Sequence, residues 1–425
     1  MKIHIGNGRL IDPASATDRV ADLFIAAGRI VSIDEKPEGF HANQEIDASG
    51  QIVCPGLVDL SVRLREPGFE YRATLESEMQ AAVAGGVTSL ACPPDTDPPL
   101  DEPGLVEMLK HKAKNLNLAH VYPIGAMTQG LLGADLTEMA ELRDAGCMAF
   151  CHADKPITNT LVMMRAMQYA ATFDLSVWLR AQDASLSRIG VAHEGEVATR
   201  LGLPGIPTVA ETIALSKILM LARDTGARIH LCRISSSEGL EMVREAKREG
   251  LPVTCDVSAN HVHLSEMDIG FFDSNCHLVP PLRSLRDRDA IRRALAEGVI
   301  DAICSDHTPV DDDAKLLPFG ESEAGATGLE LLLPLVLKWA EDDRIPLVEA
   351  LARITSRPAG ILGIEAGAIA VGKPADLCIY DPEQYWKVEP KSLKSQGKNT
   401  PFLGYEVKGK VICTLVDGHI VHRPH

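Results

Sequence analysis

The amino-acid sequence predicts an α/β protein in which a (β/α)8 barrel, or TIM barrel, carries a second domain built from both ends of the chain. Between residues 55 and 364, a short apolar run, a polar or Gly/Pro-rich break and a helical stretch follow one another eight times. Eight such units over roughly 300 residues suit a closed barrel better than an open doubly wound sheet. The two chain ends, residues 1–54 and 365–425, have a different, strand-rich texture.

The N-terminal segment consists of short apolar runs separated by turn residues such as Gly6–Gly8. Runs of this kind predict short β-strands. They lie around Ile3, Ile5, Leu10, Asp22–Ile25, Ile30–Val31 and Ile52–Val53, and similar runs return at Ala375–Tyr380, Val411–Val416 and Gly418–Val421. Two β-rich ends that flank a barrel predict one composite β-sandwich.

The barrel strands are expected where apolar runs end in polar residues. The candidates are Gly56–Leu64, Val87–Cys92, Ala119–Gly125, Met148–Cys151, Leu175–Leu179, Arg228–Arg233, Pro252–Val257 and Asp301–Cys304. Helices are expected after most of them. Ser235–Glu238 has the pattern of a capping box, and the apolar face that follows it ends at Gly250.

Composition narrows the class of protein. The chain has a net charge of −17 and is 45% hydrophobic. A strongly acidic chain argues against a nucleic acid or an anionic membrane surface as partner. No apolar run approaches the ~18 residues of a membrane span. The ten cysteines include no Cys-x-x-Cys pair, and several lie in apolar runs, which predicts buried, reduced thiols in a cytoplasmic protein.

The segment Pro55–Gly68 reads PGLVDLSVRLREPG and resembles the signature of the dihydroorotases, within the amidohydrolase superfamily. Further segments resemble landmarks of the same family: Leu161–Ala166, Glu194–Pro207, Pro280–Arg283 and Gly397–Phe402. The resemblance implies an amidohydrolase-type barrel, in which a zinc ion at the C-terminal ends of the strands hydrolyses a cyclic amide.

The positions that the resemblance assigns to metal ligands do not carry ligands in this chain. Ser61 and Arg63 replace the first two histidines, Arg180 and Arg233 replace two others, and His152-Ala153 stands where an acidic pair bridges the metals. A guanidinium has no lone pair to donate. Each such cation ~4 Å from a divalent ion would cost roughly 8 kcal/mol at an effective dielectric constant of 20. We therefore expect no zinc and no other cofactor, and hence no metal-activated hydroxide for hydrolysis.

Part of the family site remains. Asp306 and His307 occupy the positions of a catalytic aspartate and its neighbour, and Arg65 occupies the position that binds the substrate carboxylate. Asp95 and Val279 replace substrate-contacting asparagines, and Val310 replaces a histidine. We expect Asp306 and His307 to be vestigial, with Asp306 a counter-ion of depressed pKa and His307 a buried structural histidine.

Two interpretations of the arginines remain open. Arg63, Arg65, Arg180 and Arg233, with Asp95, could form an anion-binding pocket, because arginine forks suit carboxylates and phosphates. The preferred interpretation is an internal ion-pair network in which Asp306, Asp95 and Asp183 are the counter-ions. A relocated metal site, using His261 and His263 with Cys151, Cys232 and His152, is a further alternative.

The combined features predict a pseudoenzyme. Some dihydroorotase relatives persist as non-catalytic subunits of bacterial aspartate transcarbamoylase, in a dodecamer of six plus six chains, and this sequence resembles that subclass. The partner expected from the resemblance is the transcarbamoylase catalytic subunit, in a hetero-dodecamer or beside a homo-oligomer of this chain. The alternatives are an active metal-dependent cyclic amidohydrolase with a rearranged site, and a non-catalytic sensor of an anionic pyrimidine precursor.

Overall fold

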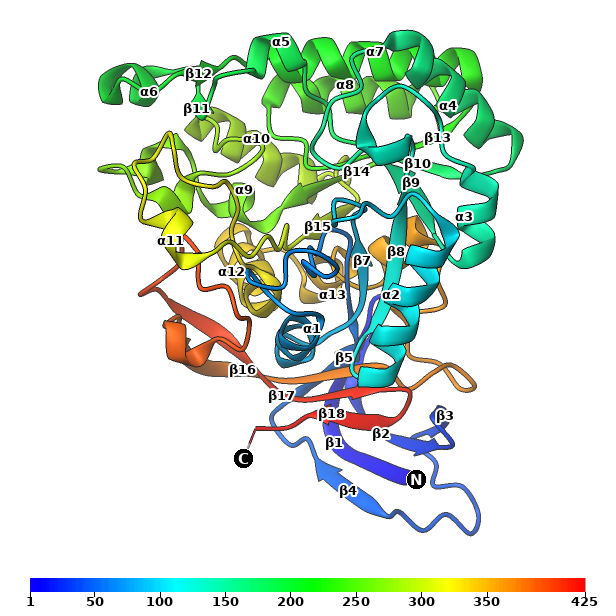
Figure 1. Ribbon diagram of the computed structural model, residues 1–425. Coiled ribbons are helices and arrows are strands. Elements are labelled where there is room, and N and C mark those ends of the chain that lie inside the picture. Colours follow the sequence, from blue (N-terminus) through cyan, green and yellow to red (C-terminus); the bar gives the residue numbers. More distant parts are fainter. Residues whose placement is uncertain (425) are drawn as a thin grey trace.

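The computed structural model describes residues 1–424 and contains the predicted barrel beside a sheet formed by both chain ends (Figure 1). Eight parallel strands follow one another around the barrel. They are β6 (Leu57–Asp59), β7 (Val87–Cys92), β8 (His120–Ala126), β9 (Ala149–Cys151), β10 (Ser176–Leu179), β13 (Arg228–Leu231), β14 (Val253–Ser258) and β15 (Ala302–Cys304). The prediction of an eightfold β/α barrel is confirmed.

The barrel closes beyond the ends of its first and last strands. Strand β6 is much shorter than the expected Gly56–Leu64, because the chain leaves the ladder after Asp59. Closure comes instead from His307, whose amide donates to the carbonyl of Ser61 over 3.0 Å and whose carbonyl accepts from the amide of Arg63 over 2.9 Å. The backbone at the metal-ligand positions therefore completes the barrel.

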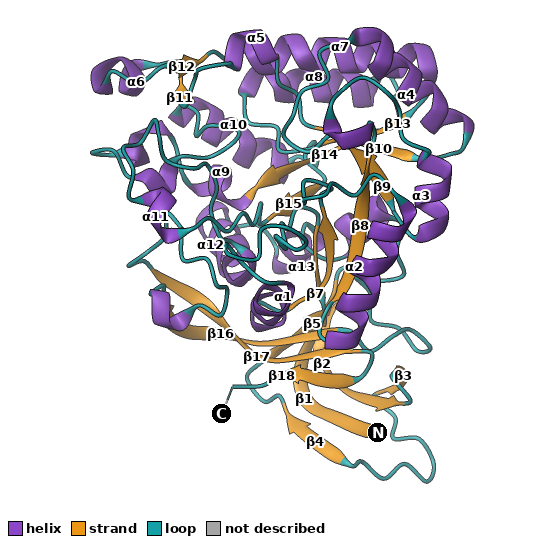
Figure 2. Ribbon diagram, viewed as in Figure 1, coloured by secondary structure: helices purple, strands orange, loops and turns teal. Residues whose placement is uncertain are grey.

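Helices surround the barrel, as the purple ribbons of Figure 2 show. The longer ones are α1 (Leu75–Ala84), α2 (Pro103–Leu116), α3 (Met139–Ala145), α4 (Thr160–Thr172), α7 (Val209–Thr225), α8 (Ser237–Arg248), α10 (Leu285–Ala296), α12 (Leu332–Asp343), α13 (Leu347–Ala352) and α14 (Ser356–Leu362). Short segments lie in the loops: α5 (Ala184–Ser187), α6 (Glu196–Leu201), α9 (Ala259–His263), α11 (Asp312–Lys315) and the two-residue strands β11 (Ala192–His193) and β12 (Gly205–Ile206). Apolar side chains from the strands and helices form one extensive core.

The start of α8 differs from the expected capping box. Its N-cap is Ser236, whose side chain accepts a hydrogen bond from the amide of Gly239. Ser235 instead donates to the buried carboxylate of Glu211 on α7, as does Ser236. The N-cap therefore lies one residue later than expected, and Glu211 binds both serines and so joins α7 to α8.

The second unit is one eight-stranded mixed sheet that combines both chain ends. Its strands are β1 (Lys2–Asp12), β2 (Thr17–Ala26), β3 (Arg29–Ile33), β4 (Gln44–Asp47), β5 (Ile52–Pro55), β16 (Leu377–Lys387), β17 (Glu406–Val416) and β18 (His419–His422). The order is β18-β17-β16-β5-β1-β2-β3, with β4 beside β1, and the sheet has a hydrophobic core of its own. Gly6–Gly8 is a bulge inside β1 rather than a turn between strands, with Asn7 at a φ of 62°.

Two further findings concern the cysteines and the helices. All ten cysteines are free thiols, and nine of them are buried. Within residues 1–424, no helix combines the length and the apolar character that crossing a membrane requires.

Candidate functional site

Three arginines converge on one carboxylate at the C-terminal ends of the barrel strands. Arg63 follows β6, Arg180 follows β10 and Arg233 follows β13, while Asp154 lies three residues beyond β9. Arg63 Nη2 lies 2.6 Å from Asp154 Oδ2, and Arg180 Nε lies 2.8 Å from Asp154 Oδ1. Arg233 Nη2 donates to the same Oδ1 atom. The side chain of Asp154 thus occupies the centre of the barrel mouth.

Two further carboxylates complete the network. Asp95, after β7, accepts from Arg63 Nε over 2.7 Å. Asp306, after β15, accepts from Arg233 Nη1 over 2.7 Å and lies 3.7 Å from Arg63 Nη1. The hydroxyl of Ser61 is 3.3 Å from the same oxygen of Asp306. The network therefore connects the ends of six barrel strands, β6, β7, β9, β10, β13 and β15.

The network shifts the pKa values of the two central carboxyls in opposite directions. Burial alone would raise the pKa of Asp154, but Arg233, Arg63 and Arg180 outweigh it and hold that pKa far below its usual range. Burial also raises the pKa of Asp306, and there Arg233 and Arg63 do not fully compensate. The expectation of a depressed pKa at Asp306 is therefore wrong, because fewer cations reach this more deeply buried carboxyl.

Four residues of the mouth adopt the left-handed backbone conformation that L-residues rarely populate. The φ angles are 63° at Arg65, 49° at Ala153, 53° at Arg233 and 51° at Asp306. Such conformations cost about 1–3 kcal/mol each and persist only where the surrounding structure imposes them. This backbone turns the side chains that follow the strands toward the barrel axis.

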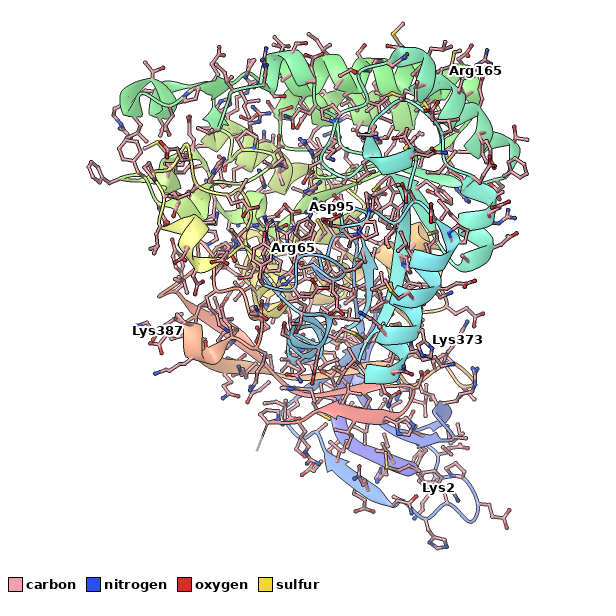
Figure 3. The ribbon with its side chains drawn as sticks, viewed as in Figure 1. Lys2, Arg65, Asp95, Arg165, Lys373 and Lys387 are labelled. Atoms are coloured by element: carbon pink, nitrogen blue, oxygen red, sulfur yellow. The ribbon has the colours of Figure 1, made fainter. Side chains whose placement is uncertain are left out.

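Arg65 is buried but lies outside the ion pairs. Its Nε donates to the carbonyl of Pro309 over 2.9 Å, and no carboxylate of residues 1–424 lies within 4 Å of its guanidinium. Burial and the neighbouring Arg63 lower the pKa of Arg65 to about 10. Arg65 and Asp95 are labelled in Figure 3, in the interior of the barrel half. Of the four arginines at this mouth, Arg65 alone has no ion pair with a carboxylate of residues 1–424.

The side chains leave little open space. A cavity of about 30 Å³ remains between Arg63, Arg180, Arg233 and the strand residues beneath them. Pockets for small organic ligands have volumes of roughly 300–1,000 Å³, whereas a single water needs only roughly 10–15 Å³. In this conformation the mouth admits water but no cyclic amide.

The donor set does not fit the zinc ion that the family resemblance implies. Three ligand positions carry guanidiniums, each of which donates to Asp154. The Nδ1 atom of His152 donates to the carbonyl of Lys155, and its Nε2 atom accepts from the hydroxyl of Thr128 over 2.8 Å. Ala153 offers no side-chain donor atom. The residues of this mouth therefore stabilise a carboxylate and would repel a divalent cation.

The side chain of His307 makes its hydrogen bonds outside the ion-pair network of the mouth. Its Nε2 donates to Oε2 of the buried Glu78 on α1, and its Nδ1 accepts from the amide of Gly328. Val310 and Val279 likewise have backbone roles: the amide of Val310 donates to Asn399 Oδ1, and the carbonyl of Val279 accepts from Arg233.

The histidines of the alternative metal site do not come together. His261 and His263 lie on the short helix α9 and not on an extended segment. In a helix, residues two positions apart do not share a face. His261 Nε2 donates to the carbonyl of Pro281 and His263 Nε2 to the carbonyl of Leu335, and burial lowers the pKa of each to about 4. Cys151 and Cys232 are thiols whose pKa burial raises. Among the described residues, these positions do not assemble three metal ligands.

The counter-ions of the network differ from the expected set in one place. Asp183 pairs with none of the arginines, because its carboxylate caps α5 through the amides of Ser185 and Leu186. Asp154 takes its place. One indication of this role is present in the sequence: Asp154 directly follows His152 and Ala153, which stand at the positions of the family's acidic pair.

Asp59, which the sequence did not indicate as part of the site, lies directly beneath the mouth. Asp59 Oδ1 accepts from the amides of Ser61 and Ser305, which holds the ends of β6 and β15 together. Its Oδ2 finds no partner among residues 1–424. Burial raises the pKa of Asp59 to about 6.

Comparison with known proteins agrees with the barrel and its attached sheet. An L-hydantoinase (dihydropyrimidinase) from Arthrobacter aurescens superimposes with a TM-score of 0.89 over 99% of this chain and 96% of that chain, at 24% identity. A D-hydantoinase from Thermus sp. gives a TM-score of 0.83 at 22% identity, over 99% of this chain and 95% of that chain. At these identities the likeness shows the fold alone. The chain therefore has the barrel and attached sheet of these hydantoinases.

Sequence comparison defines the family more closely. Residues 50–239 match the profile described as "Dihydro-orotase-like", and residues 222–422 match the profile "Amidohydrolase family". A "Dihydroorotase-like protein" of Pseudomonas aeruginosa is 46% identical over 99% of this chain and all of that protein. A "Dihydroorotase" of Syntrophotalea carbinolica is 41% identical over all of this chain and 99% of that protein. The chain belongs to the dihydroorotase-like family of the amidohydrolase superfamily.

Proposed function

We propose that this protein is a catalytically inactive member of its family that serves as an assembly subunit for aspartate transcarbamoylase in pyrimidine biosynthesis. The observation that carries the proposal is the convergence of Arg63, Arg180 and Arg233 on Asp154. These cations stand where the family resemblance places neutral metal ligands. Without a Lewis acid or a metal-bound hydroxide, hydrolysis of a cyclic amide at neutral pH has no nucleophile.

Sequence similarity also supports this proposal. Relatives named dihydroorotase-like, in Pseudomonas aeruginosa and Pseudomonas putida, are 46% identical, whereas the relatives named dihydroorotase are 39–41% identical. The barrel fold is retained while the residues at the metal-ligand positions are replaced. This combination is expected when selection acts on the outer surface of the molecule.

The proposal has a direct test. The protein is co-expressed with the aspartate transcarbamoylase of its own organism, purified through a tag on one partner, and its complex is weighed by light scattering or native mass spectrometry. We expect a stable assembly of both chains, together with no turnover of dihydroorotate or carbamoyl-aspartate. A transcarbamoylase that assembles fully without this protein, combined with an enzyme-like hydrolysis rate, would refute the proposal.

A second function, sensing an anionic pyrimidine precursor without converting it, is favoured by one observation. Arg65 is buried, and no carboxylate of residues 1–424 lies within ion-pair distance of it. Calorimetric titration with carbamoyl-aspartate and with dihydroorotate tests this function. Measurable heat that disappears in Arg65→Ala supports it, and absence of heat in the wild type excludes it.

A further inference from the structure

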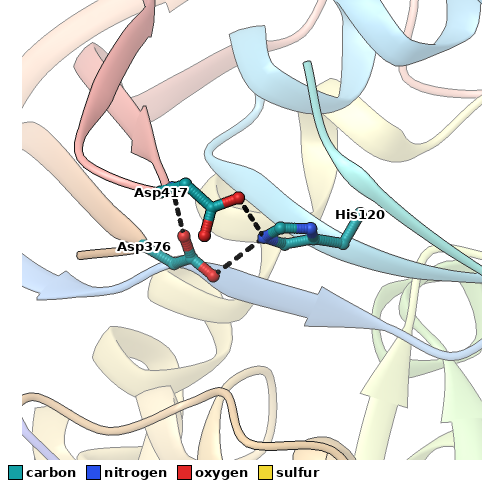
Figure 4. Close-up of side chains that lie close together, drawn as sticks. All are labelled: His120, Asp376 and Asp417. Carbon is teal, nitrogen blue, oxygen red and sulfur yellow. Dashed lines mark hydrogen bonds and ion pairs between the residues drawn. The ribbon is translucent and has the colours of Figure 1, made fainter. Parts of the chain in front are cut away.

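A histidine and two aspartates form a second cluster, next to the sheet of the two chain ends. His120 is the first residue of β8, Asp376 precedes β16, and Asp417 lies in the turn between β17 and β18 (Figure 4). Nε2 of His120 lies 3.2 Å from Asp376 Oδ2 and 3.8 Å from Asp417 Oδ2. One ligand atom from each of the three residues lies within 4.8 Å of the other two. Because His120 begins its strand, the cluster lies at the N-terminal end of the barrel, away from the mouth.

The charges of this cluster are not balanced by the surrounding protein. Within residues 1–424, neither Asp376 nor Asp417 pairs with a lysine or arginine, so one imidazole faces two carboxylates. Asp376 is held in place, because its Oδ1 accepts from the amide of Asp417 over 2.7 Å. By contrast, the His4–Asp22 and His230–Asp256 pairs each contain a single carboxylate. The fixed carboxylate of Asp376 and the exposed carboxylate of Asp417, beside one histidine, form an electron-rich site for a cation.

We propose that His120, Asp376 and Asp417 bind a divalent transition-metal ion of the zinc class. Bonds of about 2.0–2.1 Å in a tetrahedral site place neighbouring ligand atoms about 3.4 Å apart, and the two separations at His120 lie on either side of that value. An imidazole nitrogen favours zinc, cobalt or nickel over magnesium and calcium, which prefer oxygen ligands alone.

The site also has an entrance and room for a fourth ligand. His120 and Asp417 line an open cavity of about 410 Å³, whose other wall is formed by α2 residues including Lys110, His111 and Lys114. A water molecule from this cavity completes the coordination. Since its ligands come from a barrel strand and from two segments of the composite sheet, the bound ion links the two units and stabilises the folded protein.

The experiment uses the full-length protein after removal of metal with a chelator and titrates it with Zn²⁺ and, separately, with Co²⁺. We expect one equivalent of zinc to bind, a visible Co²⁺ absorption band, and a melting temperature that rises with added zinc. The variant Asp417→Asn alters an exposed side chain and should fold normally, yet weaken zinc binding 10-fold or more. His120→Ala should abolish the cobalt band.

A matched control separates this site from general surface binding. His111→Ala removes another histidine of the same cavity, one that lies outside the cluster, and should bind zinc as the wild type does. Zinc affinity that is the same in wild type, Asp417→Asn and His120→Ala would overturn the proposal, as would the absence of binding in the wild type. None of these measurements depends on the catalytic status of the barrel mouth.

Discussion

The Nε2 atom of His307 lies 2.5 Å from the Oε2 atom of Glu78, and both side chains are completely buried. Glu78 also accepts from the hydroxyl of Ser395 and the amide of Gln396. Through Glu78, His307 thus joins the loop after β15 to α1 and to the segment at Ser395 and Gln396. In this protein His307 is a positioning residue of the fold.

Glu78→Gln should destabilise the protein by about 1–3 kcal/mol, because an amide cannot accept all the bonds that the carboxylate accepts and buried donors lose their partner. Chemical denaturation followed by circular dichroism measures the change. Glu76→Gln, on the exposed face of the same helix, is the control and should change the free energy of unfolding by less than about 0.5 kcal/mol. A loss at Glu78 no larger than that of the control would contradict the structural role.

Asp154→Ala should cost about 3–5 kcal/mol, because it leaves three buried guanidiniums without their shared counter-ion. Asp306→Ala should cost less, since its two arginines, Arg63 and Arg233, keep Asp154. Urea denaturation of both variants gives the ranking. If Asp306→Ala proves the more damaging, Asp154 is not the centre of the network.

Small carboxylates should restore part of the stability that Asp154→Ala loses. Acetate can occupy the space of the removed side chain and neutralise the arginines, and ligand binding to the folded state raises its stability. We expect the melting temperature of Asp154→Ala to rise more with acetate than that of the wild type, at equal ionic strength kept with chloride. Equal responses of the two proteins would show that the arginines do not form an anion site.

Returning histidines to the first strand should not restore hydrolysis. In Ser61→His/Arg63→His, Arg180 and Arg233 remain and still repel a divalent ion. Dihydroorotate turnover and zinc content are measured with His120→Ala added, so that the cluster near β16 does not contribute metal. Turnover above the level of the parent protein would show that the first-strand ligands alone decide activity.

Asp59 should make stability depend on pH in mildly acidic solution. Its pKa is about 6 in the folded protein, against ~3.9 in an unfolded chain, so the folded state binds the proton more tightly. The free energy of unfolding should therefore fall as pH rises from about 4 to about 6, by about 2–3 kcal/mol from this group. Asp59→Asn should lack this component. Parallel pH profiles of wild type and variant would mean that Asp59 ionises normally.

The sequence was sufficient to predict the barrel because each strand carries its own local signal, an apolar run that ends in a polar residue. The arginines of the mouth could be placed through the resemblance to the dihydroorotases, since each lies near the expected C-terminal end of a strand. Their common partner, Asp154, could not be placed from the sequence. It reaches the barrel axis through a left-handed turn at Ala153, and alanine has no preference for that conformation.

Other details required the third dimension. The expectation for His261 and His263 assumed an extended chain, yet β14 passes directly into helix α9. The pKa of Asp306 depends on how burial balances two arginines, and the sequence does not give burial. The cluster of His120, Asp376 and Asp417 joins residues almost 300 positions apart, so spacing along the chain gives no sign of it.

The mixed sheet of the two chain ends has a consequence for biosynthesis. Strand β5 lies between β1 and β16. One edge of β5 therefore stays unpaired until β16 is synthesised, which happens only after the whole barrel. At 5–20 residues per second, this interval between Pro55 and Leu377 is roughly 15–60 s. During this time β5 presents an unpaired edge, the kind of surface that favours aggregation. Residues Leu377–Tyr380 of β16 thus cover an edge of β5 that is synthesised before the barrel.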